Sequence, residues 1–73
     1  MKFSKGIYAR VEFNVESRGY RKILLADRSE DLYDNLEYEF GHEVAVEASS
    51  WAEVASIGEE YEHEEFIVEM VEV

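Results

Sequence analysis

Every Lys and Arg of this chain lies in its first 28 residues, which leaves the remainder uniformly acidic. Seven basic residues and three acids give residues 1–28 a net charge of +4, whereas residues 29–73 hold the other fifteen of the eighteen carboxylates, for an overall charge of −11. Such a charge costs stability through self-repulsion. An apolar fraction of 47% and ten aromatic residues nevertheless favour a packed fold over a disordered acidic tail.

With 73 residues, the chain is expected to form one small acidic domain over residues 1–73, with a net-basic β-hairpin in residues 1–28 and an acidic αβαβ part in residues 29–73. It has no Cys for disulfides, and no apolar run approaches the roughly 20 residues of a membrane span. The first residues do not resemble a secretory signal. These features favour a cytoplasmic protein in a bacterial cell, and a phage is a candidate source of its gene.

Residues 7–16 alternate strictly between apolar and polar side chains, which predicts a strand whose inward residues are Ile7, Ala9, Val11, Phe13 and Val15. Residues 17–19 supply a turn. Residues 20–25 then predict a second strand that completes a hairpin and turns Ile23 and Leu25 toward the core.

The acidic part begins with a predicted helix. Ser29 is the expected N-cap, with Asp27 as the alternative. Leu32, Leu36 and Phe40 form its apolar stripe, and Gly41 ends it.

Three further elements are predicted behind this helix. Residues 44–48 alternate as a third strand would. Residues 50–53, Ser-Trp-Ala-Glu, match a capping box that starts a short second helix, with Trp51, Val54, Ala55 and Ile57 facing inward and Gly58 ending it. Residues 59–65 predict an acidic linker, and residues 66–73 predict a last strand that is apolar on both faces. The expected fold is an α+β domain of order ββαβαβ, a four-stranded, mostly antiparallel sheet with two helices packed on one face.

The acidic surface is the candidate functional site. Carboxylates that project at regular intervals could imitate the phosphates of nucleic acid, which follow one another at about 3.4 Å of rise on each strand. The leading hypothesis is a small inhibitor that binds a basic, nucleic-acid-binding protein as a DNA or RNA mimic, as phage anti-restriction and anti-CRISPR proteins do. No direct binding to nucleic acid or to a membrane is expected, because the overall charge repels both. The predicted partner-binding residues are Glu30, Asp34, Glu37, Glu43, Glu47, Glu59, Glu60, Glu62, Glu64 and Glu65.

The alternative hypothesis is a dimeric structural or regulatory module in which the acids only keep the protein soluble. Ile67 and Val71, on the outward face of the last strand, are the candidates for a homodimer contact. No enzymatic activity and no cofactor are expected, because the chain has neither Cys nor a glycine-rich phosphate loop. No metal site is expected either, because the acidic run 59–65 lacks the EF-hand frame and offers His63 as its one nitrogen ligand.

Overall fold

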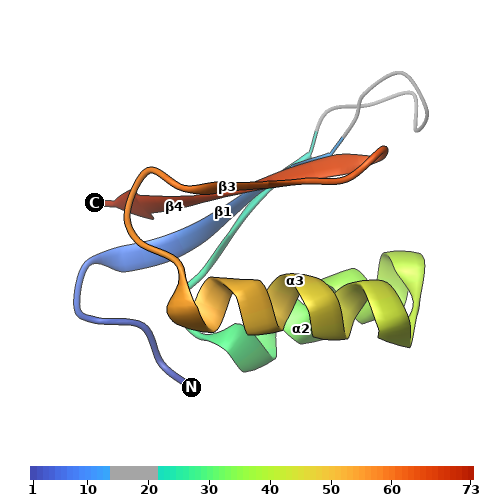
Figure 1. Ribbon diagram of the computed structural model, residues 1–73, viewed down its shortest axis with the longest axis horizontal. Helices are drawn as coiled ribbons and strands as arrows, with labels where there is room; N and C mark the ends of the chain where they lie inside the picture. Colours follow the sequence, from blue (N-terminus) through green and yellow to red (C-terminus); the bar gives the residue numbers. More distant parts are fainter. Residues whose placement is uncertain (14–21) are drawn as a thin grey trace.

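The structure is a computed structural model that describes residues 1–13 and 22–73. Within these residues two helices lie against one face of an antiparallel sheet of four strands (Figure 1). The elements follow the chain as β1 (Ile7–Phe13), β2 (Ile23–Ala26), α2 (Ser29–Phe40), α3 (His42–Val54), β3 (Glu60–Glu62) and β4 (Phe66–Glu72). The order is therefore ββααββ: the predicted α+β class and layering are confirmed, and the predicted order ββαβαβ is wrong.

The sheet has the strand order β2-β1-β4-β3 in the described part of the chain. β1 pairs with β4 along its whole length, from Ile7 opposite Glu72 to Phe13 opposite Phe66. Ala9, Val11 and Phe13 are buried, which confirms the inward face predicted for this strand. The rest of the predicted strand, the turn at 17–19 and the start of the second strand lie outside the described residues.

β2 turns the face opposite to the predicted one toward the core. Ile23 and Leu25, expected inside, are 47% and 57% exposed, whereas Leu24 is half-buried and Ala26 is buried. The register explains this, because Leu24 lies opposite Val11 and Ala26 opposite Ala9, and residues directly opposite each other share one face of a sheet. All four residues of β2 are apolar, so alternation alone could not identify the buried face.

α2 has the predicted extent and stripe, with Leu32 and Leu36 fully buried and Gly41 directly after its last residue. Its N-cap is Arg28, which makes no side-chain capping bond, so the expected caps at Ser29 or Asp27 are wrong. Ser29 is instead the first helical residue and is buried. Its hydroxyl lies 2.8 Å from carboxylate oxygens of Glu30 and Glu53, so it connects α2 with α3 rather than capping α2.

α3 occupies the segment for which a third strand and a short capped helix were predicted, and both predictions are wrong. Ala45, Ala48, Ser49 and Ala52 are its buried residues and recur at i, i+3, i+4 and i+7, the spacing of one helix face. These small side chains let α3 approach α2 closely. The alternation of residues 44–48 is incidental, since Val46 is 40% exposed. The predicted capping box lies in the second half of the helix.

The predicted acidic linker contains β3, the edge strand beside β4. α3 ends at Val54 rather than at Gly58, and Gly58 takes a φ of +92° in the turn that leads to β3. Val54 and Ile57, expected inside, are 84% and 55% exposed. β4 confirms the predicted last strand, with Phe66, Val68 and Met70 in the core.

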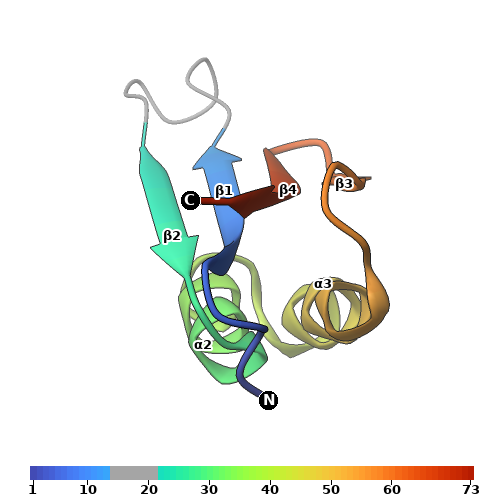
Figure 2. The ribbon, with the colours of Figure 1, turned by 90° about the vertical axis from the view of Figure 1, so that its left-hand side faces the viewer.

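The core lies between the helix layer and one face of the sheet. Its largest fully buried side chains come from both layers: Phe66, Leu32, Leu36, Met70, Val11 and Val68. Each contributes about 1.5–3 kcal/mol by leaving water. Figure 2 shows both helices on the same side of the sheet. No described element covers the other side, so the outer helix surfaces and the outer face of the sheet are the two broad surfaces of the described fold.

Candidate functional site: acidic surfaces of the helices and of the sheet

The burial of Leu32 and Leu36 determines which side of α2 faces solvent. Glu30, Asp34 and Glu37 lie on that exposed side, and residues three or four apart on a helix are neighbours at about 5–6 Å. Neighbouring carboxylates at this spacing destabilise a helix by about 0.2–0.5 kcal/mol per pair. The structure thus confirms that these predicted residues form one exposed acidic row.

A shallow groove of about 290 Å³ runs between α2 and α3 beside this row. It is lined by Ser29, Glu30, Tyr33, Asp34, Ser49 and Glu53. Glu53 was not among the predicted site residues, because its segment was interpreted as a capping box. A prediction of one helix over residues 42–54 would have placed Glu53 one turn after Ser49, on the same side of the helix. We call Glu30, Asp34, Glu37 and Glu53 the acidic helical face.

One hydroxyl connects the carboxylates at the end of this groove. Ser29 Oγ lies 2.8 Å from Glu30 Oε1 and 2.8 Å from Glu53 Oε2. A hydroxyl has a single proton, so Ser29 donates to one carboxylate at a time. The terminal ammonium of Met1 donates to Ser29 Oγ at 3.0 Å and forms an ion pair with Glu30. The end of the groove therefore contacts the N-terminal segment of the same chain.

A tyrosine hydroxyl fixes the other end of the α2 row, at Glu37. Tyr33 donates its hydroxyl proton to Glu37 Oε2 at 2.5 Å, and the same hydroxyl lies 2.7 Å from His42 Nδ1. The hydrogen bond to Glu37, together with desolvation and the charges of Glu37 and Asp34, raises the pKa of Tyr33 above 10.0. Tyr33 consequently orients the Glu37 carboxylate at the junction of the two helices.

Glu43 and Glu47 lie on α3 and not on the predicted strand. They are exposed and one turn apart. Glu47 accepts a hydrogen bond from the Tyr61 hydroxyl of β3, and the Trp51 ring lies 5.7 Å from the Tyr61 ring. Glu43 and Glu47 therefore lie on the flank of α3 nearest β3, whereas Glu53 lies on the flank nearest α2.

The remaining predicted acids lie on the sheet side of the fold. Tyr61 faces the helices, so its neighbours Glu60 and Glu62 point to the outer face of the sheet, and both are exposed. Glu59 accepts a hydrogen bond from the Ser56 backbone N–H before β3. Glu64, which is exposed, and Glu65, which is half-buried, lie in the turn before β4. Glu60 and Glu62 thus lie on the opposite side of the fold from Glu30, Asp34 and Glu37, so the ten predicted residues do not all lie on one surface.

Ile67 and Val71, the predicted dimer contacts, do lie on the outer face of the sheet. Ile67 is 43% exposed and Val71 is half-buried. β2 places Ile23 and Leu25 on this same face. The sequence did not reveal this, because both residues were predicted to face the core.

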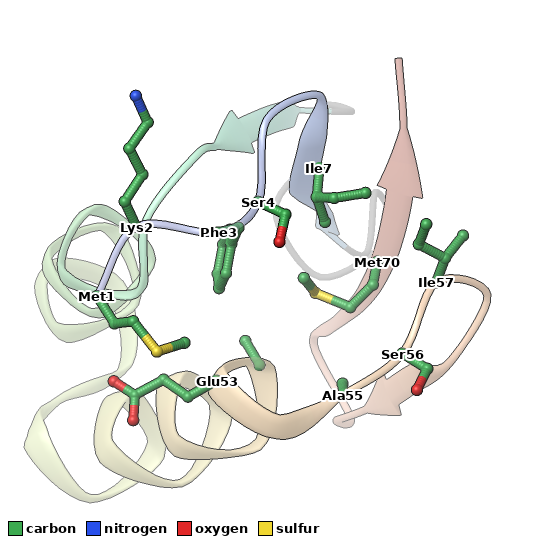
Figure 3. Close-up of a pocket in the computed structure, with 11 residues that line it drawn as sticks. Met1, Lys2, Phe3, Ser4, Ile7, Glu53, Ala55, Ser56, Ile57 and Met70 are labelled. Carbon is green, nitrogen blue, oxygen red and sulfur yellow. The ribbon is translucent and has the colours of Figure 1, made fainter.

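A larger hollow, of about 570 Å³, opens where the N-terminal segment passes the end of α3 (Figure 3). Phe3, Ile7 and Met70 give it an apolar wall, while Glu53 and Ser56 contribute a carboxylate and a hydroxyl. Its lining includes none of the ten predicted partner-binding residues. Glu53 lines both this hollow and the groove between the helices.

Within residues 1–13 and 22–73, no three His, Asp or Glu side chains lie close enough together to hold a metal ion. Neither α2 nor α3 has the length and apolar character needed to cross a membrane. The sequence matches no protein-family model, and comparisons with curated proteins and with solved structures found no match either. The geometry described above therefore defines the protein as an α+β domain with an acidic helical face.

Proposed function

We propose that this protein binds and inhibits a basic, nucleic-acid-binding protein by presenting the acidic helical face in place of nucleic acid. The observation that carries the proposal is the exposed row of carboxylates on α2, extended across the groove by Glu53 of α3. Neither helix contains Lys or Arg. The Met1 ammonium offsets the charge of Glu30, but no Lys or Arg is interspersed along the row. Asp34 therefore keeps its repulsion from the neighbouring carboxylates, a cost that a surface serving only solubility would relieve by interspersing Lys.

The geometry of the row suits this role. Residues four apart on a helix are separated by about 6 Å along its axis, which is close to two phosphate steps of about 3.4 Å on one nucleic-acid strand. Asp34, Glu43 and Glu47 form no ion pair with a Lys or Arg among the described residues. Their charge is available to the basic groove of a partner, where Arg would bind a carboxylate through two parallel hydrogen bonds.

The biological context that we propose is a bacterial cytoplasm in which a phage-encoded protein of this kind blocks a defence enzyme such as a restriction enzyme or a CRISPR effector. Composition supports this placement, through the net charge of −11 on 73 residues. A protein of this charge is attracted over long range to the basic surface of an enzyme that binds DNA or RNA.

The test is affinity capture from nuclease-treated bacterial lysate, with elution across a salt series. We expect a nucleic-acid-binding protein that is retained at low salt, is released as salt rises from about 50 mM to 200 mM, and is displaced by added DNA or RNA. Asp34→Lys combined with Glu37→Lys should weaken the binding of that protein at least tenfold. Circular dichroism of the variant should show the helix content of the parent protein.

The matched control is Glu60→Lys combined with Glu62→Lys, which changes the net charge equally but on the opposite side of the fold. If both double variants bind equally weakly, net charge alone drives the interaction and mimicry by the helices is wrong. If the α2 variant binds as well as the parent protein, the acidic helical face has no part in binding, and the dimeric structural module becomes the better hypothesis.

A further inference from the structure

The outer face of the sheet carries a group of apolar side chains although no described element covers it. Tyr8 of β1, Ile23 and Leu25 of β2, and Ile67 and Val71 of β4 all point to it. Ile23, Leu25 and Ile67 are between 43% and 57% exposed. Strands that carry apolar side chains on both faces are typical of sheets that are covered on both faces. We call these five residues, with the charged residues among them, the outer sheet face.

The charges on the outer sheet face are of both signs, unlike those of the helices. One row of directly opposite residues crosses the sheet as Leu25, Arg10, Glu69 and Glu60. The next row reads Ile23, Glu12, Ile67 and Glu62. Arg10 pairs with Glu12 at 3.3 Å. A cation therefore lies near the middle of the face on β1, and a carboxylate lies beside it on β4.

We propose that the outer sheet face binds the same face of a second copy of this chain, related by a two-fold axis that runs parallel to the strands between β1 and β4. Such an axis places β1 of each copy over β4 of the other. Arg10 of each copy then meets Glu69 of the other, so the face is complementary to itself, as a two-fold interface requires. The apolar residues of both copies are removed from water around these two ion pairs.

Electrostatics selects this axis over the perpendicular one. An axis across the strands would place β3 over β3 and bring Glu60 and Glu62 of both copies together. The parallel axis puts the two β3 strands at opposite edges of the dimer, each over the partner's β2. There Glu60 and Glu62 face strands that carry no acid on this side.

The proposed dimer is weakened by the charge of −11 on each copy, so its response to salt identifies it. Screening the repulsion should tighten the dimer as salt rises, whereas binding of a basic target at the acidic helical face weakens with salt. The two proposals use opposite sides of the fold, so either can fail without the other.

Analytical ultracentrifugation of the purified chain over a wide concentration range tests the proposal. We expect a monomer–dimer equilibrium that shifts toward dimer at higher salt. Leu25→Gln with Ile67→Gln should raise the dissociation constant at least tenfold, while Val54→Gln, a similar change at an exposed apolar residue of α3, should leave it unchanged. A monomer at every concentration, or a dimer that tolerates Leu25→Gln with Ile67→Gln, overturns the proposal.

Mixing two charge variants tests the axis itself. Arg10→Glu alone places carboxylates at both positions, and Glu69→Arg alone places cations at both, so neither variant should form a homodimer. An equal mixture restores both ion pairs between the copies and should dimerise like the parent protein. Since mixing cannot change contacts within a chain, a mixture that stays monomeric while each variant remains folded excludes the proposed two-fold arrangement.

Discussion

At the scale of single residues, Tyr61 shows how the acidic surface is held in place. Tyr61 faces the helices from an edge strand, packs beside Trp51 and donates its hydroxyl proton to Glu47. Burial raises the pKa of Tyr61 above 10.0, and the hydrogen bond and the negative charge of Glu47 raise it further. One phenol thereby connects β3 with α3 and fixes the orientation of a surface carboxylate.

This contact makes the stability of the fold sensitive to alkaline pH. Because the pKa of Tyr61 is higher in the folded state than its unfolded value of about 10, the contact stabilises the fold below pH 10 and the gain is lost as the pH rises through the folded pKa. Glu47→Gln should lower the pKa of Tyr61, since the charge is removed. The measurement is the ultraviolet absorbance of tyrosinate during titration, corrected with Tyr61→Phe. Glu43→Gln, one turn away, is the control, and an unchanged Tyr61 titration in Glu47→Gln would contradict the contact.

Sequence reasoning at this scale found Glu30, Asp34 and Glu37 because helical periodicity reports which side of a helix is exposed. It missed Glu53, which reaches the groove only because α3 runs back beside α2 and brings its last turn to Ser29. Periodicity within one segment carries no information about which other segment lies beside it. For the same reason it could not show that Glu60 and Glu62 lie on the side of the fold opposite α2.

At the scale of elements, the connection between α2 and α3 depends on the backbone conformation of Gly41. Gly41 joins α2 to α3 with a φ of 93° and a ψ of 176°, a region that is essentially restricted to Gly. Apart from its two chain neighbours, a Cβ at this position would meet no atom within 4 Å. The requirement for Gly is therefore conformational and not steric crowding by a neighbour.

Gly41→Ala should accordingly lower the free energy of unfolding by about 1–3 kcal/mol, measured by chemical denaturation. D-Ala at position 41, introduced by chemical ligation, should retain the parent stability, because its mirrored preferences include positive φ. Equal destabilisation by both enantiomers would mean that the backbone at residue 41 is not as described.

The predictions of β2 and α3 were wrong because apolar and polar residues do not separate clearly in these two segments. β2 reads Ile-Leu-Leu-Ala, so both of its faces are apolar and only pairing with β1 determines that Ala26 is buried. α3 is rich in Ala and Val, and its first residues satisfy a period of two as well as a helical period. The buried stripe of Ala45, Ala48 and Ala52 was the available signal for a helix. α2 and β1 were correct because their apolar and polar residues are clearly separated, and β4 was correct because its apolar run is bounded by the acidic segment before it.

At the scale of the whole molecule, the fold places the exposed apolar residues of the sheet on the side opposite the acidic helical face. The acidic helical face lies on one side, and the outer sheet face, with Arg10 among apolar residues, lies on the other. A protein with these two surfaces can bind a basic partner through its helices while a second copy covers its sheet. The dimer would then present two acidic helical faces pointing in opposite directions.

The same charge distribution predicts how the isolated domain responds to salt. Repulsion among carboxylates in residues 29–73 opposes folding, and added salt screens it, so the melting temperature Tm should rise with moderate NaCl. Relief of about 1 kcal/mol corresponds to a rise of about 4–8 °C for a domain of this size.

The Leu25→Gln, Ile67→Gln background keeps dimerisation from contributing to Tm. In that background, Asp34→Asn with Glu43→Gln and Glu62→Gln should raise Tm at low salt and flatten its salt dependence. A Tm that stays constant or falls with NaCl would show that the carboxylates do not oppose folding. The repulsion that we take as the signature of the acidic helical face would then be absent.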